Sequence, residues 1–129
     1  MNSPHSLSKA ERLRGKKCFS LIRRFSRSLV EGELRLYAVY FALSLDSIPL
    51  KAAFSVPKKS MRKATRRNRM KRLMREAFRL EKPSLRALLP AGEAWLVWQW
   101  NSPELPTLHT LRPRMVRLFE RFSRECVGS

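Results

Sequence analysis

Apolar residues near the start of the chain recur at the spacing of an amphipathic helix. The residues that keep steps of three or four are Cys18, Leu21, Ile22, Phe25 and Leu29. This pattern predicts a helix over about residues 16–28 with one stripe facing the core. Phe19 lies about 100° away from that stripe. Residues 31–33, Glu-Gly-Glu, are typical of a turn that follows the helix.

Residues 34–45 are rich in strand-forming side chains, and their alternation defines two faces. One face carries Tyr37, Val39, Phe41 and Leu43, and the other carries Leu36, Ala38, Tyr40 and Ala42. A second strand is predicted over residues 51–56, and Pro57 ends it because proline cannot donate to a strand ladder.

The most regular helical pattern covers residues 61–80. Its buried stripe is predicted to be Met70, Leu73, Met74, Ala77 and Phe78. The opposite side carries Asn68, Lys71, Arg72, Arg75 and Arg79. Lys82 and Pro83 are expected to end this helix, because proline lacks the N–H of a helical hydrogen bond. Residues 84–89 are then predicted to form a separate short helix.

The last third of the chain holds one apolar strand and one further helix. Residues 94–100 include three tryptophans and predict a buried strand, so those rings are assigned to the core. The final helix is expected to begin near Thr110, with Pro113 in its first turn. Its apolar stripe is Leu111, Met115, Leu118, Phe119 and Phe122. With no repeat and no visible boundary, residues 1–129 are interpreted as one domain of the α+β class, with residues 1–10 expected to be mobile.

The charge of the chain points to a polyanionic partner. The 129 residues include 28 Lys and Arg against 10 Asp and Glu, a formal net charge of +18. Small domains usually carry a net charge of about 2–8. A hydrophobic content of 43% still supplies a core, so disorder of the whole chain is not expected. Nucleic acid is the first partner class to consider, and an anionic membrane surface is the second.

Residue types that support catalysis or metal binding are scarce. Cys18 and Cys126 stand far apart without metal-ligand spacing, which indicates reduced thiols in a cytoplasmic protein. Asp46 is the only aspartate, and His5 and His109 have no visible partners. No apolar run is long enough to span a bilayer, and no export signal is visible. We therefore expect no catalytic residue, metal ligand or cofactor in the protein itself.

The basic helix and two aromatic rings are the candidate binding features. Asn68 to Arg79 form a cationic ridge about 16 Å long, and Glu76 is the only acidic residue within residues 61–80. Arginine binds phosphate through two parallel hydrogen bonds, so this face is predicted to contact RNA or DNA. Phe19 and Tyr37 are suited to stack unpaired bases. From the pattern alone, a peripheral core position remains the alternative for each ring.

Residues 67–78, RNRMKRLMREAF, resemble the RNR signature of the protein subunit of bacterial ribonuclease P. Residues 54–59, FSVPKK, resemble the strand and double-lysine element that precedes this signature in the family. Residues 11–14, followed by Phe19, resemble the family's N-terminal element, and the distance from Phe19 to Tyr37 fits its cleft aromatics. The resemblance covers residues 11–80 well and residues 95–122 only by pattern.

The resemblance implies a division of labour between RNA and protein. In the family an RNA subunit carries the catalytic site and its Mg2+, while the protein holds the 5′ leader of precursor tRNA. The protein alone is therefore expected to be inactive and to need no obligate protein partner. The residues that would contact the RNA subunit are Arg67, Asn68, Arg69, Lys71, Arg72 and Arg75, with Lys58 and Lys59 in support. The residues that would bind the leader are Phe19, Tyr37, Arg12 and Arg23.

The implied fold is a ribosomal-protein-like α/β sandwich, with a four-stranded sheet covered by helices and a left-handed βαβ crossover. Two positions depart from the family pattern. Arg23 stands where a second aromatic residue is common, and Pro57 stands where a small polar residue is usual. The main alternative is a basic ribosomal-type or RNA-chaperone protein without a role in a reaction. A membrane-active cationic protein and a self-sufficient nuclease fit the residues less well.

Overall fold

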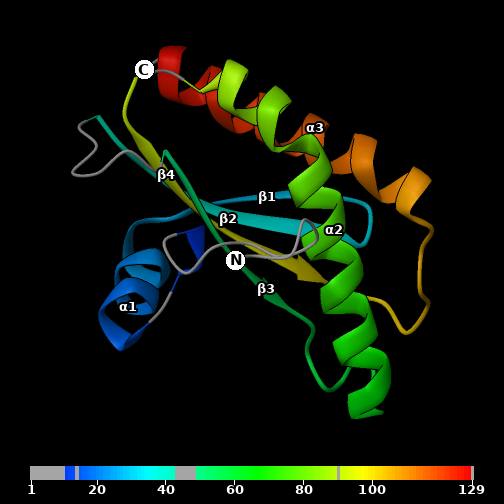
Figure 1. The fold of residues 1–129 in the computed structure, drawn as a ribbon. Helices are drawn as coiled ribbons and strands as arrows, with labels where there is room; N and C mark the ends of the chain where they lie inside the picture. Colours follow the sequence, from blue (N-terminus) through cyan, green and yellow to red (C-terminus); the bar gives the residue numbers. More distant parts are fainter. Residues whose placement is uncertain (1–10, 14, 43–48, 90, 129) are drawn as a thin grey trace, which may run out of the picture.

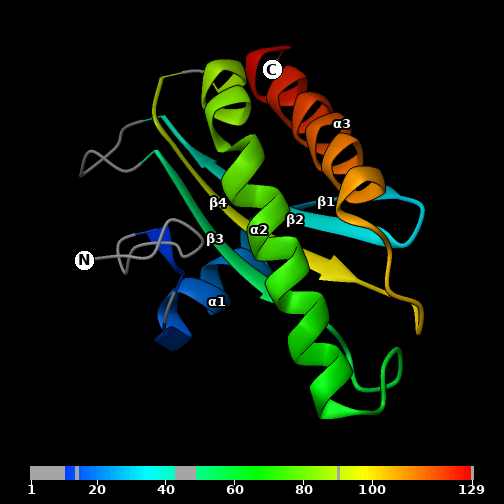
Figure 2. The same cartoon turned by 45° about the vertical axis from the view of Figure 1, so that its right-hand side comes forward.

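Helices cover both faces of a four-stranded sheet (Figure 1). The computed structural model describes residues 11–13, 15–42, 49–89 and 91–128, so residues 1–10, expected to be mobile, lie outside it. The elements in order are α1 (Gly15–Phe25), β1 (Arg27–Glu31), β2 (Leu34–Phe41), β3 (Leu50–Ser55), α2 (Ala64–Leu88), β4 (Glu93–Trp100) and α3 (Leu108–Gly128). α2 and α3 lie side by side on one face, and α1 lies on the other (Figures 1 and 2).

The sheet has the strand order β1-β2-β4-β3 and mixed directions. β1 and β2 are antiparallel, β2 and β4 are antiparallel, and β3 pairs with β4 in parallel. The parallel pair is joined through α2, which makes a βαβ crossover. The α+β class and the four-stranded sheet with covering helices are as predicted. The left-handed sense of the crossover stays a prediction from the resemblance.

The alternation predicted for residues 34–41 is confirmed by the two cores of the protein. Leu34, Leu36 and Ala38 of β2 belong to the main core, beneath α2 and α3. Val39 lies on the other face in a small cluster with Leu13 and Ile22, against which Tyr37 packs. Because successive side chains of a strand point to opposite faces, one strand serves both cores. Residues 43–45 of the predicted strand lie outside the described residues.

The first predicted helix is too long, because its last residues form a strand. α1 ends at Phe25, and residues 27–31 form β1, which pairs with β2 from Arg27 opposite Ala38 to Glu31 opposite Leu34. Gly32 has a φ of 59°, which suits the tight turn between these strands. Leu29 is buried in the main core and not on a helix stripe. Pairing with β2 thus overrides the local helical pattern.

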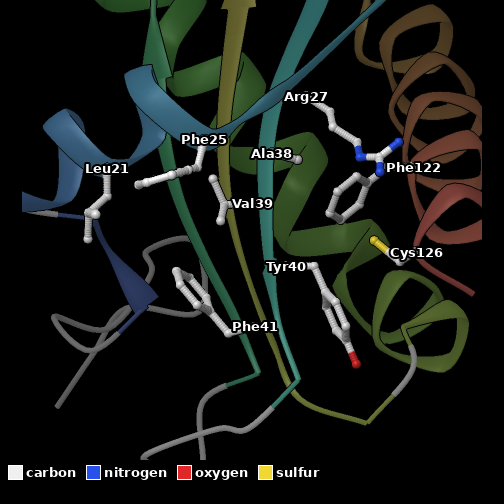
Figure 3. A pocket seen from close by; sticks show the side chains of 9 residues that line it. All are labelled: Leu21, Phe25, Arg27, Ala38, Val39, Tyr40, Phe41, Phe122 and Cys126. Carbon is white, nitrogen blue, oxygen red and sulfur yellow. The ribbon is translucent and has the colours of Figure 1, made fainter. Parts of the chain in front are cut away.

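The apolar stripe predicted for α1 is also mostly wrong. Only Ile22 is buried, whereas Leu21 is 39% and Phe25 is 60% exposed. Figure 3 shows that Leu21 and Phe25 reach toward Val39 and Phe41 of β2 across an open pocket. The reason is tertiary, because this short helix covers only a narrow strip of the sheet. The Arg24 guanidinium lies 5.5 Å from the centre of the exposed Phe25 ring.

The predicted break at Pro83 does not occur. α2 continues through Pro83 to Leu88, so residues 84–89 are the end of α2 rather than a separate helix. Proline removes one backbone hydrogen bond, but packing holds the last turns in place. Leu85 is fully buried in the main core, and the Ser123 hydroxyl of α3 donates to the carbonyl of Leu88. Along the helix, Met70, Met74, Ala77 and Phe78 are buried as predicted, while Leu73 is partly buried.

The last helix begins at Leu108, two residues earlier than predicted. The Thr107 hydroxyl accepts a hydrogen bond of 3.2 Å from the Thr110 N–H, and this bond caps the helix. Because the helix begins at Leu108, Pro113 lies beyond its first turn and not within it. The predicted stripe is confirmed, since Leu111, Met115, Leu118, Phe119 and Phe122 are all buried. Among the described residues, no helix is both long and apolar enough to cross a membrane.

The tryptophan-rich segment is the strand β4, which lies between β2 and β3. Trp98 is fully buried and Trp100 is 3% exposed, both within the main core. Trp95 is half-buried on the other face, where its ring meets Phe41 edge-on at 4.7 Å between centroids. The core position predicted for the three tryptophans is therefore confirmed for Trp98 and Trp100, whereas Trp95 packs partly buried against the small cluster.

Candidate nucleic-acid interface

The outer face of α2 carries a run of cationic side chains, as predicted. Asn68, Arg69 and Arg72 are exposed, and Lys71 and Arg75 are half-buried. The helix presents this face because Met70, Met74 and Phe78 on the inner side are buried against the sheet and α3. Since an α-helix advances about 1.5 Å per residue, guanidinium groups on this face are spaced to contact successive phosphates of an RNA strand.

Several arginines of this helix also bind the protein itself, among them Arg66, which donates a hydrogen bond of 3.0 Å to the carbonyl of Pro103. The Arg67 guanidinium donates hydrogen bonds of 2.9 Å and 2.8 Å to the carbonyls of Met61 and Arg62, and so holds the loop before α2. Arg79 forms an ion pair of 2.6 Å with Glu76, and this hydrogen bond raises the pKa of Arg79. The ridge therefore retains its free positive charge toward Asn68 and loses part of it at the Arg79 end.

The loop that precedes α2 exposes Lys58 and Lys59. The turn in this loop is closed by backbone hydrogen bonds from the N–H groups of Ser60 at 3.0 Å and Met61 at 3.2 Å to the carbonyl of Pro57. The turn lies just ahead of α2 in the chain. Lys59, predicted to support the contact with the RNA subunit, instead lines a pocket together with Tyr37, a residue predicted for the leader.

Phe19 and Tyr37, predicted as a pair, line one pocket between α1 and the sheet. The pocket has a volume of about 290 Å³ and is completed by Ile22, Arg23, Ser26 and Val97. Phe19 is 37% exposed, and Tyr37 is half-buried. The pocket thus offers two aromatic faces and one cation, Arg23, to a planar ligand. Arg23 is one of the two positions that depart from the pattern of the resemblance, and it supplies charge here where an aromatic ring would supply stacking.

A larger polar pocket adjoins the aromatic one, because Tyr37 lines both. It has a volume of about 820 Å³, and its polar lining includes Arg35, Lys59, Gln99 and Asn101. Arg35 donates a hydrogen bond of 3.3 Å to the Tyr37 hydroxyl, and its guanidinium lies 5.9 Å from the centre of that ring. The Tyr37 ring is therefore held between the two pockets.

Sequence reasoning missed Arg35, Gln99 and Asn101. Arg35 could have been found, because it precedes Tyr37 by two residues on one strand and so shares its face. Gln99 shares the face of Val97 on β4, because the two residues are two positions apart. That Gln99 lies beside Arg35 follows only from the pairing of β2 with β4, which the sequence does not reveal. Asn101 belongs to a loop, which no periodicity places.

Arg12 does not lie with Phe19 and Tyr37. It forms an isolated parallel bridge with Ala52 of β3, and it lines a separate pocket together with Arg75 of α2. The structure thus groups Arg12 with the basic helix, on the β3 side of the sheet, rather than with the aromatic pocket. The set of four residues expected at the leader is therefore divided between two places.

The aromatic and cationic groups of this arrangement are suited to binding nucleic acid. No group of three or more His, Cys, Asp or Glu side chains that could hold a metal ion occurs within the described ranges. Cys18 and Cys126 are both partly buried cysteines, and burial raises the pKa of Cys126. The buried carboxylate of Glu93 forms an ion pair of 3.2 Å with the ammonium group of Lys51, so this carboxylate has a structural partner. The aromatic and cationic groups can stack bases and bind phosphates.

Comparison with known proteins gives a consistent result. A family model described as Ribonuclease P matches residues 7–122. The Ribonuclease P protein component of Porphyromonas gingivalis strain W83 is 34% identical over 128 residues, covering 95% of this chain and 92% of that protein. The protein component from Chlorobaculum tepidum is 41% identical over 85 residues, covering 60% of this chain and 52% of that protein.

Solved structures show the same fold. The RNase P protein from Thermotoga maritima superposes with a TM-score of 0.65 at 28% identity, covering 86% of this chain and 96% of that one. The Staphylococcus aureus RNase P protein superposes with a TM-score of 0.66 at 19% identity, covering 88% of this chain and 96% of that one. The second likeness is one of fold alone.

Proposed function

We propose how the residues of this chain take part in tRNA 5′ processing, since the chain belongs to the ribonuclease P protein family. The role of that family is tRNA 5′ processing together with an RNA subunit. The outer face of α2 binds the RNA subunit, and the pocket between α1 and the sheet binds the single-stranded 5′ leader of precursor tRNA. The RNA subunit performs the hydrolysis. The protein thereby favours substrates that carry a leader, and it acts in the cytoplasm, where its RNA partners are expected.

The observation that carries the leader assignment is the shared pocket of Phe19 and Tyr37. Duplex nucleic acid hides its base faces, whereas an unpaired strand can stack bases on aromatic rings. The adjoining polar pocket supplies Lys59 and Arg35 for the phosphates of the same strand. Aromatic rings beside cationic groups are what a single strand requires, because its bases and its phosphates are both accessible.

Magnesium belongs to the RNA subunit in this proposal. Across the part of the chain that the structure describes, no cluster of potential ligands fits a resident metal ion. Magnesium supplies Lewis-acid chemistry to phosphodiester hydrolysis when it is bound in the holoenzyme. The residues of this chain bind and orient RNA, and no step of hydrolysis is assigned to them.

Identifying the RNA that co-purifies with the tagged protein tests this function. We expect one structured RNA, on the order of several hundred nucleotides long. Isolated together with the protein, this RNA should cleave precursor tRNA. Ribosomal RNA or a broad mixture of transcripts would instead favour the ribosomal-type or RNA-chaperone alternative.

Replacing Phe19 by alanine is expected to weaken binding of leader-bearing precursor tRNA to the holoenzyme by about tenfold. Stacking on one ring contributes about 1–3 kcal/mol, and about 1.4 kcal/mol corresponds to tenfold. Binding of mature tRNA should change little, because it has no leader. Titration of both RNAs against wild-type and F19A holoenzymes measures the difference.

Phe25→Ala provides the matched control for this experiment. It removes the same side chain from the same helix, but Phe25 is 60% exposed and does not line the aromatic pocket. We expect F25A to bind both RNAs as the wild type does. If F19A weakened the binding of both RNAs equally, or lowered the thermal stability as a core deletion does, Phe19 would be a structural residue.

A further inference from the structure

Two positively charged side chains from distant parts of the chain meet at the edge strand β3. Arg12 precedes α1, and Arg75 lies in α2, yet both line one pocket of about 290 Å³. The floor of the pocket is formed by Leu13 and by residues 52–54 of β3. A small pocket with two guanidinium groups has the chemistry of an anion site.

Arg12 is held in position by its two neighbours. Glu11 forms an ion pair with Lys82 of α2, and both side chains are largely shielded from solvent. Leu13 is buried, and its N–H donates a hydrogen bond of 3.1 Å to the carbonyl of Ala52. The backbone on both sides of Arg12 is therefore fixed to the main body of the protein. With the backbone fixed, only the side-chain rotamers of Arg12 have to be ordered when it binds a ligand.

Arg75 is likewise constrained, and no carboxylate of the described residues pairs with it. Its guanidinium lies 5.6 Å from the centre of the Phe54 ring, which restricts its direction. Partial burial lowers its pKa, and the nearby positive charges of Arg12 and Arg72 lower it further. In the described part of the chain, neither Arg12 nor Arg75 forms an ion pair with a carboxylate. Like charges brought together in this way are stabilised by an anion.

We propose that Arg12 and Arg75, with Arg72 close by, form a pocket that binds one backbone phosphate of RNA. A phosphate fits better than a carboxylate-bearing protein, because the rest of the α2 outer face is cationic and matches a polyanion. The proposal rests on the proposed function and deepens it, since the phosphate comes either from the RNA subunit or from precursor tRNA. It gives Arg12 a different role from that of Phe19 and Tyr37.

The test compares Arg12→Ala with Arg124→Ala, which removes an exposed arginine from α3 and so changes the net charge equally. One arm measures the affinity of the protein for the RNA subunit over a range of salt concentrations. The second arm measures the affinity of the assembled holoenzyme, at saturating protein, for precursor tRNA. We expect R12A to lower the affinity about tenfold in one arm. In that arm the logarithmic salt slope should fall by about 0.7–0.9. The arm that responds identifies which RNA supplies the phosphate.

Arg12→Lys keeps the proposal testable if R12A does not fold. Lysine keeps the positive charge but cannot make the paired hydrogen bonds of a guanidinium. We expect R12K to keep the wild-type salt slope and to lose about threefold in affinity. Effects of R12A equal to those of R124A in both arms, or wild-type affinity of R12K in both arms, would overturn the phosphate pocket. Failure of the wild-type protein to bind the RNA subunit would instead contradict the proposed function.

Discussion

Purified free of RNA, this protein is expected to leave precursor tRNA uncut. Hydrolysis of a phosphodiester needs an activated nucleophile and stabilisation of the leaving oxygen, commonly through metal ions or an acid–base pair. Glu93 is a buried acid, and its carboxylate pairs with Lys51. The described residues hold no cluster of His, Cys, Asp or Glu that could ligate a metal. Adding the RNA subunit and magnesium should produce cleavage at the 5′ end of the tRNA.

Gel analysis of labelled precursor tRNA measures this difference. The protein sample is first treated with a ribonuclease that is then removed, so that no RNA subunit persists. Mature tRNA, which has no leader, serves as the uncleaved control. Correctly placed cleavage by the RNA-free protein would overturn the assignment of hydrolysis to the RNA subunit.

Replacing Phe78 by alanine is expected to lower the free energy of unfolding by about 3–5 kcal/mol. Phe78 is fully buried where α2 meets the sheet, and its ring lies 6.0 Å from that of Phe54 and 6.3 Å from that of Trp98, between centroids. Removing the ring leaves a cavity beneath the helix that carries the cationic ridge. Urea unfolding followed by circular dichroism measures the loss.

Phe25→Ala is the control for this measurement, because the Phe25 ring is 60% exposed. It should change the free energy of unfolding by less than about 0.5 kcal/mol. A comparable loss for the two variants would show that the Phe78 ring contributes no more than a surface ring. At a low temperature, where the F78A protein is still folded, its affinity for the RNA subunit should stay near that of the wild type. The reason is that the side chains of the cationic ridge are unchanged.

Much of the fold, and the separation of buried from exposed side chains on α2 and β2, could be predicted from the sequence for reasons of local geometry. The 3.6-residue period of α2 separates Met70 and Met74 from Arg72, and these residues are buried and exposed accordingly. The two-residue period of β2 likewise assigns Leu36 to the main core and Tyr37 to the α1 face. The family resemblance added the RNA partners proposed for these surfaces, and the Ribonuclease P match of residues 7–122 confirmed the family.

Where contacts between distant segments determine the secondary structure, the sequence patterns predicted the wrong element or gave no prediction. The helical spacing that ends at Leu29 was outweighed when residues 27–31 gained backbone hydrogen bonds from β2. Pro83 was expected to end a helix, but burial of Leu85 and the contact of Ser123 with Leu88 hold the following turns. In each case tertiary contacts outweigh a local preference of a few kcal/mol at most.

The sequence by itself determined the basic helix, the alternating strand faces and the family. Only the tertiary structure decided which charged and aromatic residues share a pocket. Phe19 and Tyr37 meet because α1 packs across β2, whereas Arg12 joins Arg75 because residues 12–13 pair with β3. Periodicity reports which side of an element a residue occupies, and it carries no information about the neighbouring element. That information arises from long-range packing and strand pairing, which depend on the whole chain at once.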